Sequence, residues 1–140
     1  MLAPEHVQRF CTEDITEAEF AKLHSEYADA NCAVYQIKCC CSNEHFHIIY
    51  DERPSCWAKC TDCGNVITLY DLKCYPSAIY INNIFTKYNL SEAGSNVYKV
   101  CVMYEYADDY ESCDDISWCN IWCKNKSTGN ILNLINDETS

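Results

Sequence analysis

A group of closely spaced cysteines restricts the fold of this chain more than any other feature of its sequence. Cys39, Cys40 and Cys41 are consecutive, and after 18 intervening residues come Cys60 and Cys63, which have two residues between them. A zinc ion takes four tetrahedral ligands, and two tight turns that each present two thiolates can supply them. The intervening segment is long enough for one β-hairpin, which would bring the turns together. We therefore expect Cys39, Cys41, Cys60 and Cys63 to hold a structural Zn²⁺.

The segment from residue 37 to 71 resembles the zinc-ribbon family, in which two cysteine knuckles face each other across a three-stranded sheet. It departs from the usual pattern at the first knuckle, where the cysteines are spaced by one residue instead of two and Ser42 stands where glycine is common. Cys40, Cys56 and Cys74 are further ligand candidates. Because Cys40 lies between Cys39 and Cys41, the ligand pair within residues 39–41 stays open. The resemblance implies antiparallel hairpins around one structural ion.

Other uses of the cysteines fit the sequence less well. A thioredoxin-like redox pair would lie at a strand-to-helix junction, whereas Cys63 is followed by a strand-like segment, residues 66–70. A zinc deaminase requires His-x-Glu and Pro-Cys-x-x-Cys, but the chain has a histidine at His47 and a lysine at Lys59 in the corresponding places. The remaining alternative is that all 13 cysteines are core or unpaired thiols.

Two histidines, His45 and His47, share one face of a predicted strand and could complete a metal site or lie at its rim. A pair of surface histidines without a ligand role is the simpler interpretation. With four sulfur ligands on the ion, no coordination position is left open for a catalytic water. We therefore expect no enzymatic activity.

Hydrophobic periodicity predicts one helix and several strands. Residues 13–31 read as an amphipathic helix that starts with a capping box at Thr16 and Glu19 and carries apolar positions from Phe20 to Tyr27. Residues 76–90 favour a short helix. Strands are expected at residues 33–38, 46–50, 56–59, 66–70, 97–106, 116–123 and 130–135. The expected fold class is α+β, with an N-terminal helix, zinc-ribbon-like hairpins and a separate C-terminal antiparallel sheet, in a single domain spanning residues 1–140.

The charge of the chain restricts its partners. Its 21 acidic and 10 basic residues give a formal net charge of −11, which repels nucleic acid and anionic membranes and attracts a basic macromolecule. No run approaches the roughly 18 apolar residues of a membrane span, and the first residues lack the pattern of a secretory signal. We therefore expect a cytosolic protein that binds neither membranes nor nucleic acid directly. Solubility alone is the simpler explanation of the charge.

One segment concentrates the negative charge. Within eleven residues that contain no lysine or arginine, tyrosines alternate with carboxylates. Such a segment between two strands can present charge and aromatic anchors to a partner. A solvated loop is the competing interpretation, and the repeating pattern of a calcium loop is missing. The candidate partner-binding residues are Glu105, Asp108, Asp109, Glu111, Asp114 and Asp115.

A small, acidic α+β protein without a visible catalytic group is similar in general character to the immunity proteins of bacterial polymorphic-toxin and contact-dependent growth inhibition systems. This resemblance implies that the chain binds and neutralises a cognate toxin domain, commonly a basic nuclease, through the six carboxylates. The alternatives are a zinc-ribbon adaptor in a nucleic-acid or transcription complex and a metal-dependent enzyme. The sequence determines neither the identity of the toxin nor the oligomeric state.

Overall fold

The structure of the chain is a computed structural model that describes residues 2–51, 55–71, 87–108, 111 and 116–138. Within these residues there are nine strands, one α-helix and one short 3-10 helix, η1. In chain order they are η1 (Gln8–Phe10), β1 (Cys11–Thr12), α1 (Ala18–Tyr27), β2 (Cys32–Ile37), β3 (Phe46–Asp51), β4 (Ser55–Cys60), β5 (Val66–Asp71), β6 (Lys87–Asn89), β7 (Tyr98–Tyr106), β8 (Ile116–Asn125) and β9 (Ile131–Glu138).

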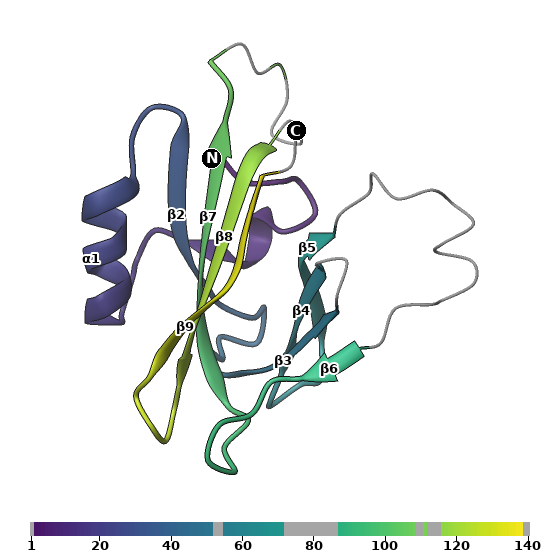
Figure 1. Ribbon diagram of the computed structural model, residues 1–140. Helices are drawn as coiled ribbons and strands as arrows, with labels where there is room; N and C mark the ends of the chain where they lie inside the picture. Colours follow the sequence, from purple (N-terminus) through teal and green to yellow (C-terminus); the bar gives the residue numbers. More distant parts are fainter. Residues whose placement is uncertain (1, 52–54, 72–86, 109–110, 112–115, 139–140) are drawn as a thin grey trace.

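All nine strands belong to one antiparallel sheet (Figure 1). Strand β7 connects the two parts of this sheet, because it has pairing partners along both edges. One edge of β7 pairs with β8, which in turn pairs with β9. Along the other edge, residues 101–105 pair with β2, and Tyr98 pairs with Phe46 at the start of β3. Strands β3, β4 and β5 then follow as a meander, with β6 on β3.

The predicted α+β class is wrong. Half of the described residues lie in strands and 12% in helix, and the sheet curls instead of dividing into hairpins and a second sheet. The last three strands are continuous with the others because β7 has pairing partners on both edges, which a hydrophobic pattern does not reveal. Irregular register within β4–β5, β7–β8 and β8–β9 contributes to the curl, since bulges bend a strand and increase its twist.

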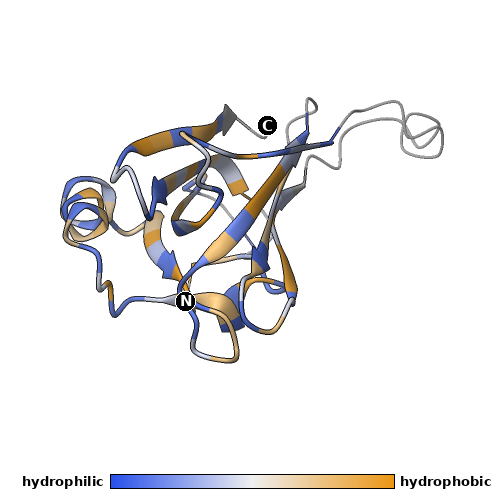
Figure 2. Ribbon diagram, turned by 90° about the horizontal axis from the view of Figure 1, so that it is seen from below, coloured by the Kyte–Doolittle hydropathy of each residue, from blue (hydrophilic) through white to orange (hydrophobic). Residues whose placement is uncertain are grey.

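Strand β7 separates two hydrophobic clusters. Tyr98, Val100 and Tyr104 face the larger cluster, which lies between the halves of the curled sheet. Cys101 and Met103 face the smaller one, under α1. Figure 2 shows hydrophobic and hydrophilic residues alternating along the strands. Both faces of β7 are therefore covered by hydrophobic residues.

Helix α1 packs against the sheet through Phe20, which is fully buried. The predicted capping box is wrong, because the N-cap position is Glu17 and no side chain within the helix caps it. Instead Oε1 of Gln36, a buried residue of β2, accepts hydrogen bonds from the backbone N–H groups of Thr16 at 2.9 Å and Glu17 at 3.3 Å. The acceptor comes from a distant strand, so a local capping rule could not identify it.

The seven predicted strands are confirmed, with ends shifted by up to a few residues. Most of the short helix predicted at residues 76–90 lies outside the described residues. Its described portion is residues 87–90, of which residues 87–89 form strand β6 instead and pair with residues 49–51 of β3. Among the residues that the structure describes, no helix has the length and apolar character that crossing a bilayer requires.

Candidate metal centre

Two loops at one end of the β3–β4–β5 meander carry the predicted metal ligands. Cys39 and Cys41 lie between β2 and β3, while Cys60 ends β4 and Cys63 lies in the turn before β5. Because Cys60 pairs with Phe46 in the β3–β4 register, the loop before β3 meets the turn after β4. The four sulfur atoms lie within 4.8 Å of one another, so the predicted clustering is confirmed.

The sulfur positions suit a shared ion better than disulfides. Cys39 Sγ lies 3.5 Å from Cys63 Sγ, and Cys41 Sγ lies 3.5 Å from Cys60 Sγ. A disulfide requires a distance of about 2.05 Å. Four sulfurs at about 2.3 Å from a tetrahedral zinc ion would be separated by about 3.8 Å from one another. This group could therefore hold a metal ion with little rearrangement.

The two loops have matching backbone hydrogen bonds. In the first loop Cys39 donates its N–H to the carbonyl of Asn43, and Ser42 donates to the carbonyl of Cys39, both at 2.9 Å. In the second loop Cys60 donates to Asn65 at 2.9 Å, and Gly64 donates to Cys60 at 3.1 Å. The first loop is thus one residue shorter, matching its shorter cysteine spacing.

Ser42 occupies the position that corresponds to the glycine of the second loop. Its φ of +75° is nearly the same as the +76° of Gly64. A non-glycine residue with positive φ is uncommon, because its Cβ crowds the backbone. Although serine replaces the usual glycine in the first knuckle, the backbone at Ser42 therefore has nearly the same φ as Gly64 in the second knuckle.

Asn43 connects the two loops and stabilises one sulfur. Its Nδ2 donates to Cys60 Sγ at 3.3 Å and to Thr61 Oγ1 at 2.8 Å. The backbone N–H of Cys63 also points to Cys60 Sγ, at 3.5 Å. Although burial opposes ionisation, these hydrogen bonds lower the pKa of the Cys60 thiol to about 6. Cys60 is therefore prepared to be a thiolate, the form in which cysteine binds metals.

The cluster lies at the protein surface with one side covered. Cys39 and Cys60 are buried, whereas Cys41 and Cys63 are exposed. Burial is the largest cause that raises the pKa of Cys39. A metal ion in this position would be shielded by the protein on the buried side and by two sulfurs on the other.

The other candidate ligands lie outside this group of four. Cys40 is exposed, with its sulfur 3.9 Å from that of Cys39. Cys56 is fully buried in the larger hydrophobic cluster, and Cys74 lies outside the described residues. His47 Nδ1 lies 3.0 Å from the carbonyl oxygen of Asn96. Neither His45 nor His47 joins the cysteine cluster in the described part of the chain.

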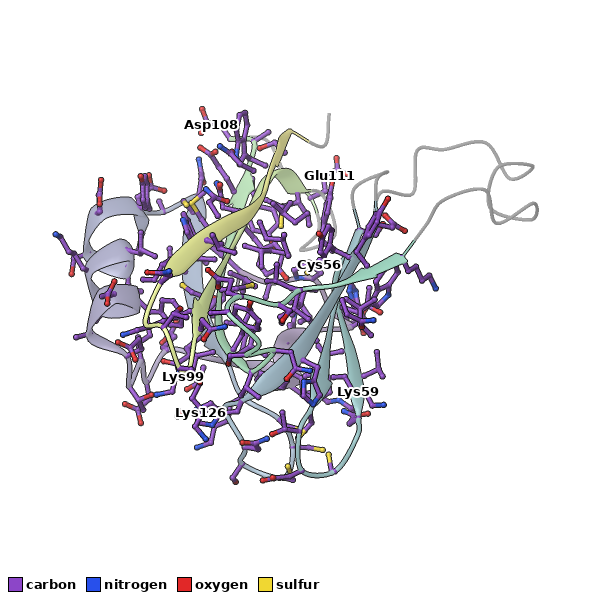
Figure 3. The ribbon with its side chains drawn as sticks, turned by 60° about the horizontal axis from the view of Figure 1, so that its bottom comes forward. Cys56, Lys59, Lys99, Asp108, Glu111 and Lys126 are labelled. Atoms are coloured by element: carbon purple, nitrogen blue, oxygen red, sulfur yellow. The ribbon has the colours of Figure 1, made fainter. Side chains whose placement is uncertain are left out.

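The predicted acidic surface is described only in part. Glu105, Asp108 and Glu111 are exposed, and Asp108 accepts a hydrogen bond from the side chain of Asn31. The other three predicted residues, Asp109, Asp114 and Asp115, lie outside the described residues. In Figure 3, Asp108 and Glu111 lie at one end of the molecule, and Lys99 and Lys126 lie near the other.

A basic pocket was missed by the sequence analysis. It has a volume of about 400 Å³, and its lining includes Lys99 of β7, Lys124 of β8, Lys126 of the following turn, His45 and Glu17. Only the β7–β8 register, in which Lys99 lies opposite Lys124, brings the basic residues together. The spacing of these residues in the sequence contains no signal that would identify them as a group.

Comparison with known proteins adds no relative. No protein-family model matches the chain, and no curated protein and no solved structure matches it either.

Proposed function

We propose that Cys39, Cys41, Cys60 and Cys63 bind one structural zinc ion. The observation that carries this proposal is the meeting of four cysteine sulfurs within 4.8 Å on two loops of matching backbone geometry. Tetrahedral sites of four thiolates are typical of zinc or of iron. Four protein ligands complete the tetrahedron, so the ion would have a structural role and would not activate water.

The ion would hold the two cysteine loops together at one end of the β3–β4–β5 meander. The two loops are joined by hydrogen bonds through Asn43, and each contributes one buried and one exposed sulfur to the cluster of four. Four thiolates held close together without a cation would repel one another. Metal binding and the folding of these loops should therefore be coupled.

Metal analysis of the purified chain tests this proposal. We expect one equivalent of zinc per chain, retained through gel filtration and released when all thiols are alkylated. The chelator-treated protein should lose thermal stability and regain it on addition of Zn²⁺. Stoichiometric iron, or reduced protein that neither contains nor takes up metal, would overturn the proposal.

We further propose that the chain acts by binding a basic protein, and that the partner is a bacterial toxin domain of the nuclease type. The support is the net charge of −11 together with the exposed carboxylates of Glu105, Asp108 and Glu111. Electrostatic attraction of this kind accelerates association and weakens as salt is added. The alternative function is an adaptor in a nucleic-acid or transcription complex.

Binding to the toxin-like product of a neighbouring gene, measured by calorimetry at low and high salt, tests the second proposal. Neutralising the acidic group in the triple variant Glu105→Gln, Asp108→Asn, Glu111→Gln should weaken binding by at least about tenfold, since these carboxylates would make charge-assisted contacts. The control triple variant Glu13→Gln, Asp14→Asn, Glu26→Gln removes three exposed charges elsewhere.

We expect this control to change the affinity by less than about threefold, which is the effect of net charge alone. Equal losses in the two triple variants would contradict the assigned surface. Retention of nucleic acid by the unmodified chain, without binding to the basic protein, would favour the adaptor.

A further inference from the structure

The basic pocket is unexpected in a chain of this composition. The chain has 10 basic residues against 21 acidic ones, yet three of its lysines, Lys99, Lys124 and Lys126, line a single pocket. Among the lining residues Glu17 supplies the single carboxylate. The pocket therefore carries a local positive charge on a strongly acidic protein.

The arrangement of two of these lysines opposes stability. Lys99 and Lys124 lie directly opposite each other on β7 and β8, and like charges in such cross-strand positions destabilise a sheet. Lys124 is well neutralised, since its Nζ lies 2.7 Å from Glu17 and 3.1 Å from Glu19. Lys99 shares the same Glu17 carboxylate at 3.7 Å, which is beyond hydrogen-bond distance. Its charge is only partly compensated.

The other polar groups of the pocket are available to a ligand. Lys126 is exposed, and within the described residues its ammonium group makes no ion pair. The half-buried ring of His45 likewise has no hydrogen-bond partner among the described side chains and backbone. Its pKa is lowered, by burial first and then by Lys126 and Lys99, against smaller opposing effects of Glu44 and Asp62.

The turn after β8 is held by hydrogen bonds and contains Ser127 and Thr128. Asn125 Oδ1 accepts hydrogen bonds from the backbone N–H groups of Ser127 at 2.9 Å and Thr128 at 3.0 Å. Lys126 is fixed in the same turn by its backbone N–H, which donates to the carbonyl of Val97 at 2.9 Å. Ser127 and Thr128 line the pocket in this hydrogen-bonded turn.

We propose that this pocket binds the phosphoryl group of a small phosphorylated compound. Glu17 and Glu19 neutralise Lys124. The ammonium groups of Lys99 and Lys126 remain to face a ligand, and two such groups suit a phosphate dianion better than a singly charged carboxylate. A volume of about 400 Å³ suits a small molecule. The net charge of −11 opposes a polyanion such as nucleic acid. This site is independent of the proposed zinc ion and of the acidic surface.

Titration of the metal-loaded full chain by calorimetry and amide NMR tests the proposal. The ligands are inorganic phosphate, ribose 5-phosphate, acetate and a single-stranded DNA dodecamer, at constant ionic strength. We expect saturable binding of phosphate, with shifts confined to the β7–β8 end and the residues around His45, and weaker binding of acetate. Saturable binding of either inorganic phosphate or ribose 5-phosphate would support the site. Whichever of the two binds more tightly shows whether the site prefers free phosphate or a phosphorylated compound. Absence of saturable phosphate binding, or tighter binding of DNA, would overturn it.

Matched variants locate the site. Lys126→Gln and Lys99→Gln should each weaken phosphate binding about tenfold, the effect of one charge-assisted hydrogen bond. Lys59→Gln removes the same charge from an exposed position on β4, outside the pocket, and should leave the affinity unchanged. An equal loss in Lys59→Gln would show a general charge effect and would overturn the assignment.

A variant with a gain in affinity excludes a folding artefact. Glu17→Gln removes the carboxylate that competes for Lys99 and Lys124. It should tighten phosphate binding about threefold, an increase that misfolding cannot produce. Weaker binding in this variant would contradict the proposed role of the two lysines.

Discussion

Replacing Cys60 with serine is expected to remove the metal ion and, with it, the cooperative thermal unfolding of the protein. A serine hydroxyl does not replace a thiolate as a zinc ligand, and the other three sulfurs would remain close together without a full ligand set. Structural zinc contributes about 10–16 kcal/mol in small zinc-binding peptides, whereas a whole domain is stable by only about 5–15 kcal/mol. The measurements are metal content per chain and thermal unfolding followed by circular dichroism.

Cys40→Ser is the matched control for this prediction. Cys40 lies in the same loop and is exposed, but it is not part of the cluster of four. We expect this variant to keep one metal equivalent and the melting temperature of the unmodified protein. Full metal content and unchanged melting in Cys60→Ser would contradict the site. Loss of metal in Cys40→Ser with retention in Cys41→Ser would instead assign Cys40, and not Cys41, as the second ligand of the first loop.

Phe46→Ala is expected to destabilise the metal-loaded protein by about 3–5 kcal/mol, the range for deleting a buried phenylalanine side chain. Phe46 is fully buried and begins β3. It lies opposite Cys60 of β4 on one side and Tyr98 of β7 on the other. The deletion would leave a cavity where the meander joins the rest of the sheet. Urea unfolding at saturating zinc measures the change.

Val66→Ala provides the comparison for this packing effect. Val66 begins β5 close to the same cysteine loop, but it is 52% exposed. Its truncation should cost no more than about 0.5 kcal/mol, as for other surface substitutions. Phe46→Ala should retain its metal, since all four sulfurs remain, so the loss of stability would be a packing effect. Similar losses of stability in the two variants would contradict the packing role of Phe46 where the meander joins the rest of the sheet.

Local patterns in the sequence predicted the strands well. The alternation in residues 97–106 predicted strand β7 because one side of that segment, including Val100 and Tyr104, faces the larger cluster while Cys101 and Met103 face the smaller. The cysteine spacing similarly predicted the meeting of two loops, because a hairpin between them must bring its ends together. Both inferences depend only on the geometry of a strand and of a turn.

Contacts between distant segments were predicted poorly. The fold class was wrong because nothing in the β7 sequence indicates that β2, β3 and β8 all pair with it. The capping box failed because Gln36, on a strand after the helix, accepts hydrogen bonds from the backbone N–H groups of Thr16 and Glu17 just before α1. The described end of the helix predicted at residues 76–90 is a strand, since β6 has an edge of β3 to pair with.

The sequence by itself therefore determined seven of the nine described strands, the meeting of the two cysteine loops and the acidity of the protein, because periodicity, short-range spacing and charge are properties of the chain. The tertiary structure alone decided that the strands form one curled sheet. It also decided that Lys99, Lys124 and Lys126 line one pocket with Glu17. Backbone hydrogen bonds between strands are the same for every sequence, so the pairing and register of distant strands depend on how the whole chain packs.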